Sequence, residues 1–270
     1  MEKKIKSILC VTAAVIIITT SLSSCSASEN GKSSTEKTTE KTTVSTTVTT
    51  TENTETTFPE TSTRKIYAGL NKKKGDTFPH KICSYSTNYN SADKTRTANL
   101  KASADKIDKI VIPEGRVFSF NQTVGKRTVT AGYETAKVIK DGEFVDGLGG
   151  GVCQVSSTVF EAVLRANAEI VQRSNHTLEI GYVPLGGDAT VQWNSRDFQF
   201  KNTLDTDIEL RMSCKNGKLT CTVYSRERVD VGNVSIKITE SKGIYTLTRT
   251  VNGSTNYTTK SKYRKAKAND

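Results

Sequence analysis

The chain has 270 residues, enough for one or two domains, and its formal net charge at pH 7 is +11. With only two histidines, His80 and His176, and no CxxC pair, the composition gives little support to a zinc site, and we expect no metal and no cofactor. The excess positive charge lies after residue 63 and suits polyanionic wall polymers, peptide carboxylates or anionic lipid, or serves solubility alone.

The first 24 residues have the layout of a secretion signal. Three lysines at positions 3, 4 and 6 precede a short apolar run over residues 8–18, which is too short to span a bilayer comfortably. The sequence LSSC that ends at Cys25 resembles a bacterial lipobox, in which the cysteine is lipidated and becomes the mature N-terminus; the alternative is an ordinary signal with a chance cysteine. Both alternatives predict export, and the lipobox predicts an extracytoplasmic protein that is anchored to the cell membrane and faces the wall. Nucleic acid is then a poor candidate partner.

Residues 25–63 are expected to form a linker behind the lipidated cysteine. Of the 38 residues from 26 to 63, 21 are Ser or Thr and the only aromatic is Phe58. Such a segment cannot bury enough apolar surface to offset its ordering entropy. An extended chain reaches about 3 Å per residue, so this linker would carry the folded part tens of ångströms from an anchor.

The folded part begins near Arg64. Helical spacing of apolar residues predicts a helix from Thr97 to about Lys109. The stretch KIVIPEGRVFSF predicts two strands around a Pro-Glu-Gly turn, and TAKVIKDGEFV predicts a hairpin around Asp141 and Gly142. A second, more apolar helix is expected to follow the glycine-rich segment GLGGGVC and to pack one face on a sheet.

Strand-like segments dominate after that helix: EIVQR, HTLEIGYV, ATVQW, DFQFKN, IELRMSC and LTCTVYS, followed by NVSIKI and a pair around an Asn252-Gly253 turn. We therefore expect an α+β fold with a mixed or mostly antiparallel sheet, one main helix that begins at the glycine-rich cysteine motif, and an added C-terminal β-hairpin. Residues 64–228 would form the catalytic domain, and residues 229–270 the C-terminal strands and a basic, frayed tail.

Cys153 lies where the glycine ribbon turns into the helix. The first turn of a helix has unpaired N–H groups and the positive end of the helix dipole, and both favour a thiolate, which is the nucleophilic form. Gly150 and Gly151 let the backbone approach a substrate closely, and their N–H groups are candidate donors to the oxyanion of an acyl-transfer intermediate. The alternative is a small buried cysteine beside glycines that permit tight packing.

His176 is the candidate general base, because it is the only histidine downstream and lies in the polar sequence QRSNHT. Asp188, in a glycine turn, is the first choice for the group that orients the imidazole. A surface histidine and an aspartate that satisfies turn amides are the alternatives. Separately, Cys214 and Cys221 flank the turn sequence KNGKLT, and a cross-strand disulfide between them is possible.

Several motifs in order resemble the VanW-like domain family: GGGVCQVSS, Arg173 with His176, YVPLGGDATV and DFQFKN. The resemblance extends from about Lys81 to about Arg228, and some members of the family are understood as cysteine L,D-transpeptidases that form 3-3 cross-links in peptidoglycan. It implies that Cys153 is the nucleophile and His176 the base.

Other positions of these motifs are candidates for substrate contact. We expect Gln154 and Ser156, in the first helical turn, to contact substrate or to cap the helix. Many relatives have Arg where this chain has Gly187, and Arg173 or Arg196 would compensate in binding a carboxylate.

Three functions remain open at this point. The first is a peptidoglycan L,D-transpeptidase that forms an acyl-enzyme with a stem tetrapeptide and transfers it to a neighbouring stem amine. The second is a non-catalytic lipoprotein that binds the cell wall or a glycopeptide. The third is a cysteine peptidase of the wall, which shares the first chemical step and differs in releasing the acyl group to water.

Overall fold

The computed structural model describes residues 66–140 and 142–265. The expected signal, Cys25, the linker and Asp141 lie outside the described residues. The described residues belong to one compact unit. In the described part of this unit, no helix has the length and apolar character needed to cross a membrane.

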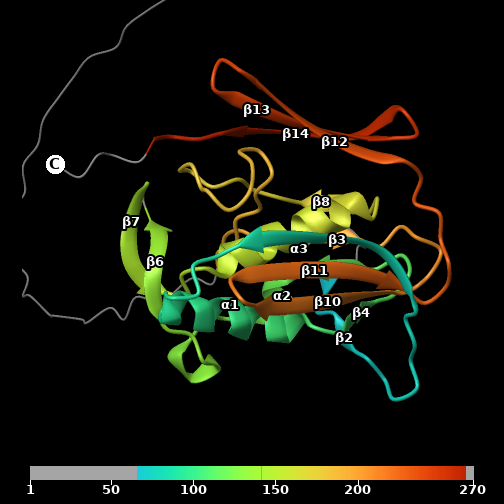
Figure 1. Ribbon diagram of the computed structural model, residues 1–270, viewed down its shortest axis with the longest axis horizontal. Coiled ribbons are helices and arrows are strands. Elements are labelled where there is room, and N and C mark those ends of the chain that lie inside the picture. The colour runs from blue at the N-terminus through green and yellow to red at the C-terminus, as the bar shows by residue number, and fades with distance from the viewer. Residues whose placement is uncertain (1–65, 141, 266–270) are drawn as a thin grey trace, which may run out of the picture. The chain divides into compact units, whose positions relative to one another are not determined.

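The fold is α+β with mostly antiparallel sheets, as the sequence predicts (Figure 1). The helices are α1 (Lys94–Ile107), α2 (Phe120–Val124), α3 (Val152–Arg165) and a 3-10 turn at Val129–Ala131. The strands are β1 (Ile66–Tyr67), β2 (Leu70–Asn71), β3 (His80–Asn88), β4 (Ile110–Ile112), β5 (Val117–Ser119), β6 (Thr135–Lys140), β7 (Glu143–Leu148), β8 (Glu169–Gln172), β9 (Gln199–Lys201), β10 (Ile208–Lys215), β11 (Lys218–Ser225), β12 (Val234–Ser241), β13 (Ile244–Val251) and β14 (Ser254–Lys262).

A five-stranded antiparallel sheet in the order β2-β4-β10-β11-β3 supports the two longer helices. Helix α3 packs on β3 and β11, and α1 packs on β10 and on α3. A second sheet has the order β1-β5-β9-β8, in which only the β1–β5 pair is parallel among the described strands. The helix expected from Thr97 starts slightly earlier, because the side chain of Asp93 accepts a hydrogen bond from the amide of Arg96 and caps it.

Helix α3 is buried around almost its whole circumference. Every residue from Val152 to Leu164 is buried except Cys153. The polar members are paired inside the fold: Thr158 donates to the carbonyl of Gln154, and Glu161 forms an ion pair with Arg165. The buried surface of α3 is therefore wider than the single apolar face predicted from its valines. The other faces carry polar residues whose hydrogen bonds are made inside the fold.

The C-terminal region forms the predicted strand and hairpin, with the turn at Asn252-Gly253, and joins them in a three-stranded antiparallel sheet, β12-β13-β14 (Figure 1). It differs from the prediction at its end. The tail expected to fray from Lys260 instead continues β14 to Lys262, and Tyr263 then hydrogen-bonds to Asp188. These contacts order the basic tail as far as Arg264, whose amide donates to the carbonyl of Thr177.

Two predicted strands are wrong. The segments 176–183 and 189–193 belong to a long loop that contains only isolated bridges. Side chains and single backbone bonds, not a strand ladder, hold this loop. The hydroxyl of Ser157 accepts from the amide of Ala189, and the amide of His176 donates to Asp188. The amide of Arg264 donates to the carbonyl of Thr177. The alternating apolar pattern reflects burial of side chains such as Leu178 and Val191 in a loop, not pairing in a sheet.

The disulfide that the sequence left possible between Cys214 and Cys221 does not form, since both are free cysteines. The β10–β11 hairpin does form at the predicted turn, but its register pairs Cys214 with Leu219 and Cys221 with Met212. The two cysteines are thus diagonal neighbours across the strands. Diagonal positions lie about 7–8 Å apart, which is farther than a disulfide permits.

Candidate active site

The nucleophile candidate Cys153 is the second residue of α3 and the one partly exposed position in its first three turns. Its sulfur lies 3.5 Å from the hydroxyl of Thr190 and accepts a hydrogen bond from the amide of Val191 at 3.5 Å. The loop that follows His176 therefore returns to the start of α3 and contacts the thiol directly.

The glycine ribbon fixes how the chain enters α3. Gly151 precedes the helix with a φ of 109°, a backbone conformation that residues with a side chain rarely adopt. A Cβ at Gly150 would lie 2.6 Å from the carbonyl oxygen of Lys137 on β6, so only glycine fits there. Within the described part of the chain, the amides of Gly150 and Gly151 donate to no acceptor, which leaves two donors beside the first turn.

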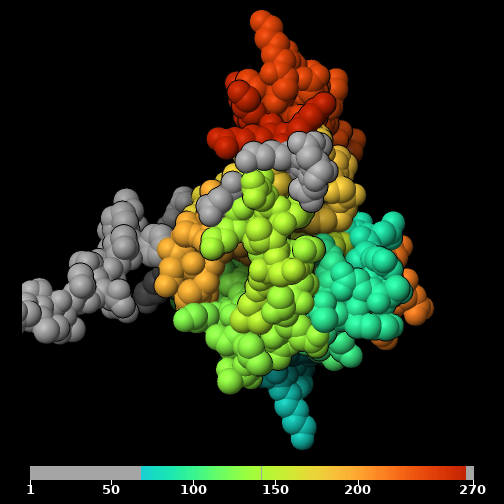
Figure 2. All heavy atoms as spheres, turned by 90° about the vertical axis from the view of Figure 1, so that its left-hand side faces the viewer, coloured from blue at the N-terminus to red at the C-terminus, as the bar shows by residue number. Residues whose placement is uncertain are grey.

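The hairpin of β6 and β7 leads into this ribbon and stands on one face of the molecule, in yellow-green in Figure 2. Two apolar side chains of β7 are exposed, Phe144 at 51% and Leu148 at 38%. Trp193, two residues beyond the contact of Val191 with the thiol, is also 37% exposed. Apolar surface is therefore available on both segments that lead to the thiol.

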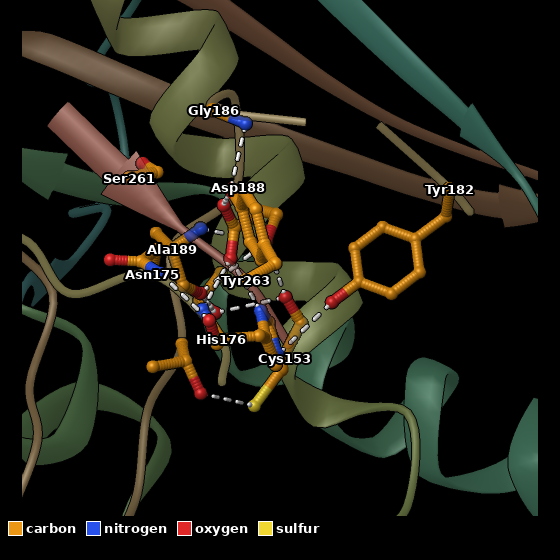
Figure 3. Close-up of polar contacts among 12 residues, drawn as sticks. Cys153, Asn175, His176, Tyr182, Gly186, Asp188, Ala189, Ser261 and Tyr263 are labelled. Carbon is orange, nitrogen blue, oxygen red and sulfur yellow. Dashed lines mark hydrogen bonds and ion pairs between the residues drawn. The ribbon is translucent and has the colours of Figure 1, made fainter. Parts of the chain in front are cut away.

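His176 lies between Cys153 and Asp188 (Figure 3). Its Nδ1 is 2.6 Å from Oδ2 of Asp188, and its backbone amide donates to the same oxygen at 2.6 Å. With Nδ1 occupied by the carboxylate, Nε2 is the nitrogen available to the thiol. The hydroxyl of Tyr182 lies 3.4 Å from Nε2.

The second oxygen of Asp188 is also saturated. Nη2 of Arg173 donates to Oδ1 at 2.9 Å, and the hydroxyl of Tyr263 donates to Oδ1 as well. The side chains of Arg173, Asp188 and His176 are 2%, 0% and 6% exposed, so this network is buried. A buried carboxylate with four donors stays ionised and cannot rotate freely.

Electrostatics favour a thiolate and an imidazolium at this position. Burial alone would raise the pKa of Cys153, but hydrogen bonding and charge interaction with His176, together with Thr190 and the amide of Val191, lower that pKa from 9.0 to about 7. Burial alone would lower the pKa of His176, but the hydrogen bond to Asp188 and the interaction with Cys153 raise it from 6.5 to about 9. Near pH 7 to 9 the pair therefore populates the ion-pair form that a nucleophilic thiol requires.

Three residues expected near substrate have their polar groups turned into the fold. The side-chain amide of Gln154 donates to Thr87 and to the carbonyl of Asn88, and the hydroxyl of Ser156 donates to the carbonyl of Ala189. Arg173 is the buried partner of Asp188. All three side chains are buried and hydrogen-bonded inside the fold, so they support the site and do not face a substrate.

Gly187 lies against α3. A Cβ at this position would be 2.3 Å from Oε1 of Glu161, so the carboxylate occupies the space that a larger residue would need. Because Arg173 is engaged by Asp188, it is not free to replace a substrate-binding arginine here.

Sequence reasoning missed Thr190, Tyr182 and Tyr263. Thr190 and Tyr182 lie inside the motif YVPLGGDATV, which stands out in the sequence. The motif alone does not reveal which of its side chains face the thiol. Tyr263 is 75 positions from Asp188 and lies in a sequence that reads as a basic tail.

Comparisons with known proteins match the central part of the chain. Residues 95–224 match the family model described as VanW like protein. The uncharacterized protein YoaR of Bacillus subtilis (strain 168) is 46% identical over 146 residues, which cover 54% of this chain and 48% of that protein. Vancomycin B-type resistance protein VanW of Enterococcus faecalis (strain ATCC 700802 / V583) is 26% identical over 162 residues, which cover 56% of this chain and 59% of that protein.

The chain thus matches only about half of the length of these curated relatives. No solved structure matches it. The matched segment contains the thiol, the imidazole and the carboxylate of the site, and residues 95–224 therefore form a VanW-like domain.

Proposed function

We propose that this protein is an exported cysteine acyltransferase, an L,D-transpeptidase that acts on peptidoglycan stem peptides. The observation that carries the proposal is the partly exposed Cys153 thiol beside His176, whose Nδ1 is held at 2.6 Å by Asp188. A buried cysteine that served packing alone would not need an imidazole held by a saturated carboxylate.

The first step is attack of the thiolate on the carbonyl carbon of the L-centre of a stem diamino acid. A C–S bond forms, and the amides of Gly150 and Gly151 stabilise the oxyanion. The C–N bond to the terminal D-amino acid then breaks, and the leaving nitrogen takes the proton from Nε2 of His176. The product of this step is a thioester on Cys153.

The second step transfers the acyl group to an amine of a neighbouring stem. His176 accepts a proton from that amine, the new C–N bond forms, and the C–S bond breaks to regenerate the thiolate. Asp188 stays ionised throughout and stabilises the imidazolium each time it forms. Release of the same thioester to water would make the protein a cysteine peptidase.

The N-terminal features of the sequence favour a location at the cell wall. The signal layout, the lipobox-like Cys25 and the Ser/Thr-rich linker favour an extracytoplasmic protein tethered to the cell membrane. The name of the VanW relative links it to resistance against vancomycin. Exposed Leu148 and Trp193, on the two segments that lead to the thiol, offer apolar contact for a peptide substrate. The net positive charge favours anionic wall polymers.

The test is incubation of the purified full chain with muropeptides that end in a tetrapeptide stem, followed by intact-mass analysis. We expect an acyl adduct on Cys153, loss of one D-amino acid, and cross-linked dimers when an acceptor stem is present. Cys153→Ala should fold and form neither product. A wild-type protein that binds muropeptides but acquires no adduct would contradict the proposal and favour a binding lipoprotein, whereas adduct formation with only hydrolysed product would identify a peptidase.

A further inference from the structure

The end of β14 brings two side chains into the network behind His176. Ser261 and Tyr263 are two positions apart and so lie on the same side of the chain. Ser261 accepts a hydrogen bond from Nη1 of Arg173 at 2.8 Å, and Tyr263 donates to Oδ1 of Asp188 (Figure 3). Both residues lie beyond position 224, where the VanW-like match ends.

The backbone of the same segment holds the loop that carries His176. The amide of Arg264 donates to the carbonyl of Thr177 at 2.8 Å, and the side chain of Asn175 donates to the carbonyl of Lys262 at 3.0 Å. These two bonds flank position 176 on both sides. The C-terminal strand is therefore tied to the loop immediately before and after the imidazole.

Tyr263 also links both ends of the turn that presents Asp188. Its hydroxyl accepts from the amide of Gly186 at 2.7 Å while it donates to Asp188. Burial and the nearby Asp188 carboxylate raise the pKa of Tyr263 to about 12, so the phenol keeps its proton at any physiological pH. Its ring packs against Tyr245 of β13, with centroids 5.6 Å apart.

From this geometry we infer that Tyr263 is a positioning residue for the Cys153–His176 pair, and that the C-terminal sheet is part of the catalytic unit. This inference rests on the proposed function for its catalytic meaning. Among the described residues, no hydrogen bond joins Tyr263 to the thiol or the imidazole. It acts through Asp188, whose orientation against Nδ1 it restricts. Without the phenol hydroxyl, Oδ1 of Asp188 loses one of its two donors and Gly186 loses its acceptor.

Other ionisable groups face this network and set the background for the test. They come from α3, from the end of β8, from the loop and from neighbouring segments: Cys153, Glu161, Arg173, Tyr182, Arg96 and Arg127. Tyr263→Phe replaces none of these side chains, so a matched pair of tyrosine variants isolates the effect of the single hydroxyl.

The experiment compares Tyr263→Phe with Tyr245→Phe in the full chain. Tyr245 is the ring partner of Tyr263, and its hydroxyl has no described contact with Asp188, so its variant removes a hydroxyl from the same sheet while leaving the network intact. The first readout is the pH dependence of Cys153 alkylation by iodoacetamide, which needs no substrate. The second is the acyl-transfer rate, separated into kcat and KM. The third is the melting temperature.

For Tyr263→Phe we expect the midpoint of the alkylation profile to move to higher pH, because a less restrained Asp188 stabilises the imidazolium less, and kcat to fall about tenfold with KM little changed. Tyr245→Phe should match the wild type in both. A lower melting temperature with an unchanged alkylation profile would overturn the inference and leave Tyr263 a purely structural residue. A shifted profile in a protein that forms no acyl adduct would uphold the positioning role and reject the transpeptidase.

Discussion

His176 and Asp188 are joined twice, because Oδ2 of Asp188 accepts from both the backbone amide and Nδ1 of His176, each at 2.6 Å. The first bond fixes where the residue lies, and the second fixes the tautomer and the rotation of the ring. A histidine held in this way offers Nε2 in one direction, toward the thiol of Cys153. The geometry of the pair therefore depends on a single carboxylate oxygen.

The first prediction concerns the thiol. Since interaction with His176 lowers the pKa of Cys153 to about 7 against the effect of burial, alkylation of the native protein should reach half of its maximal rate near pH 7. In His176→Ala only burial and the weaker hydrogen bonds remain, so the midpoint should move above the ordinary value of 9.0. Iodoacetamide rates measured across pH 5 to about 10 provide the test.

His80→Ala is the matched control, because His80 lies at the start of β3 and has no contact with the thiol among the described residues. Its alkylation profile should coincide with that of the wild type. A His176→Ala profile that also coincided with the wild type would show that the imidazole does not ionise the thiol.

The second prediction concerns the buried carboxylate. Asp188→Asn leaves the guanidinium of Arg173, 2% exposed, without a charged partner, and breaking a buried pair costs about 3–5 kcal/mol in the free energy of unfolding. Asp146→Asn is the control, since Asp146 and its partner Lys137 are both about two-thirds exposed and such pairs contribute about 0–1 kcal/mol. Urea unfolding at pH 7 gives both values.

The same variant carries a pH signature. Burial would raise the pKa of Asp188, but hydrogen bonds from His176 and the charge of Arg173 lower it below 3.8. Its contribution to stability is therefore complete above the pKa of the unfolded chain and is lost as pH falls through the lower, folded value. The difference between wild type and Asp188→Asn should therefore shrink below about pH 4. It should also shrink as pH rises from 6.5 to about 9, because Asp188 holds the raised pKa of His176. A difference that shrank as pH fell from 8 to about 6 would contradict this assignment.

The third prediction follows from the free cysteines. Burial raises the pKa of Cys83 to about 12 and raises that of Cys221 still further, whereas Cys153 is partly exposed and its pKa is lowered. Brief alkylation near neutral pH should therefore modify Cys153 first. After denaturation without a reducing agent, peptide mapping should find all four described thiols modified, including Cys214. If Cys214 and Cys221 could be alkylated only after reduction, they would form the disulfide that the strand register excludes.

Local rules predicted α1, the β10–β11 turn and α3, because capping, turn chemistry and helical spacing depend on neighbouring residues. They also drew attention to His176 and Asp188. They failed for the loop between β8 and β9, where apolar residues are buried without pairing in a sheet. They also failed for Tyr263, whose partner is 75 positions away, because no local pattern encodes so distant a contact.

The last prediction tests the entry to α3. In Gly150→Ala the new Cβ would lie 2.6 Å from the carbonyl oxygen of Lys137 and 2.7 Å from the carbonyl carbon of Ala136, both backbone atoms of β6, so the strand or the ribbon must shift. We expect a loss of about 1–3 kcal/mol in the free energy of unfolding and a larger relative loss of acyl transfer, because the displaced amides no longer meet the oxyanion. Gly181→Ala is the control, since a Cβ there meets nothing within 4 Å. Full acyl transfer by a folded Gly150→Ala protein would mean that the ribbon contributes no oxyanion donors, and the stabilisation would then have to come from the loop that carries Thr190 and Val191.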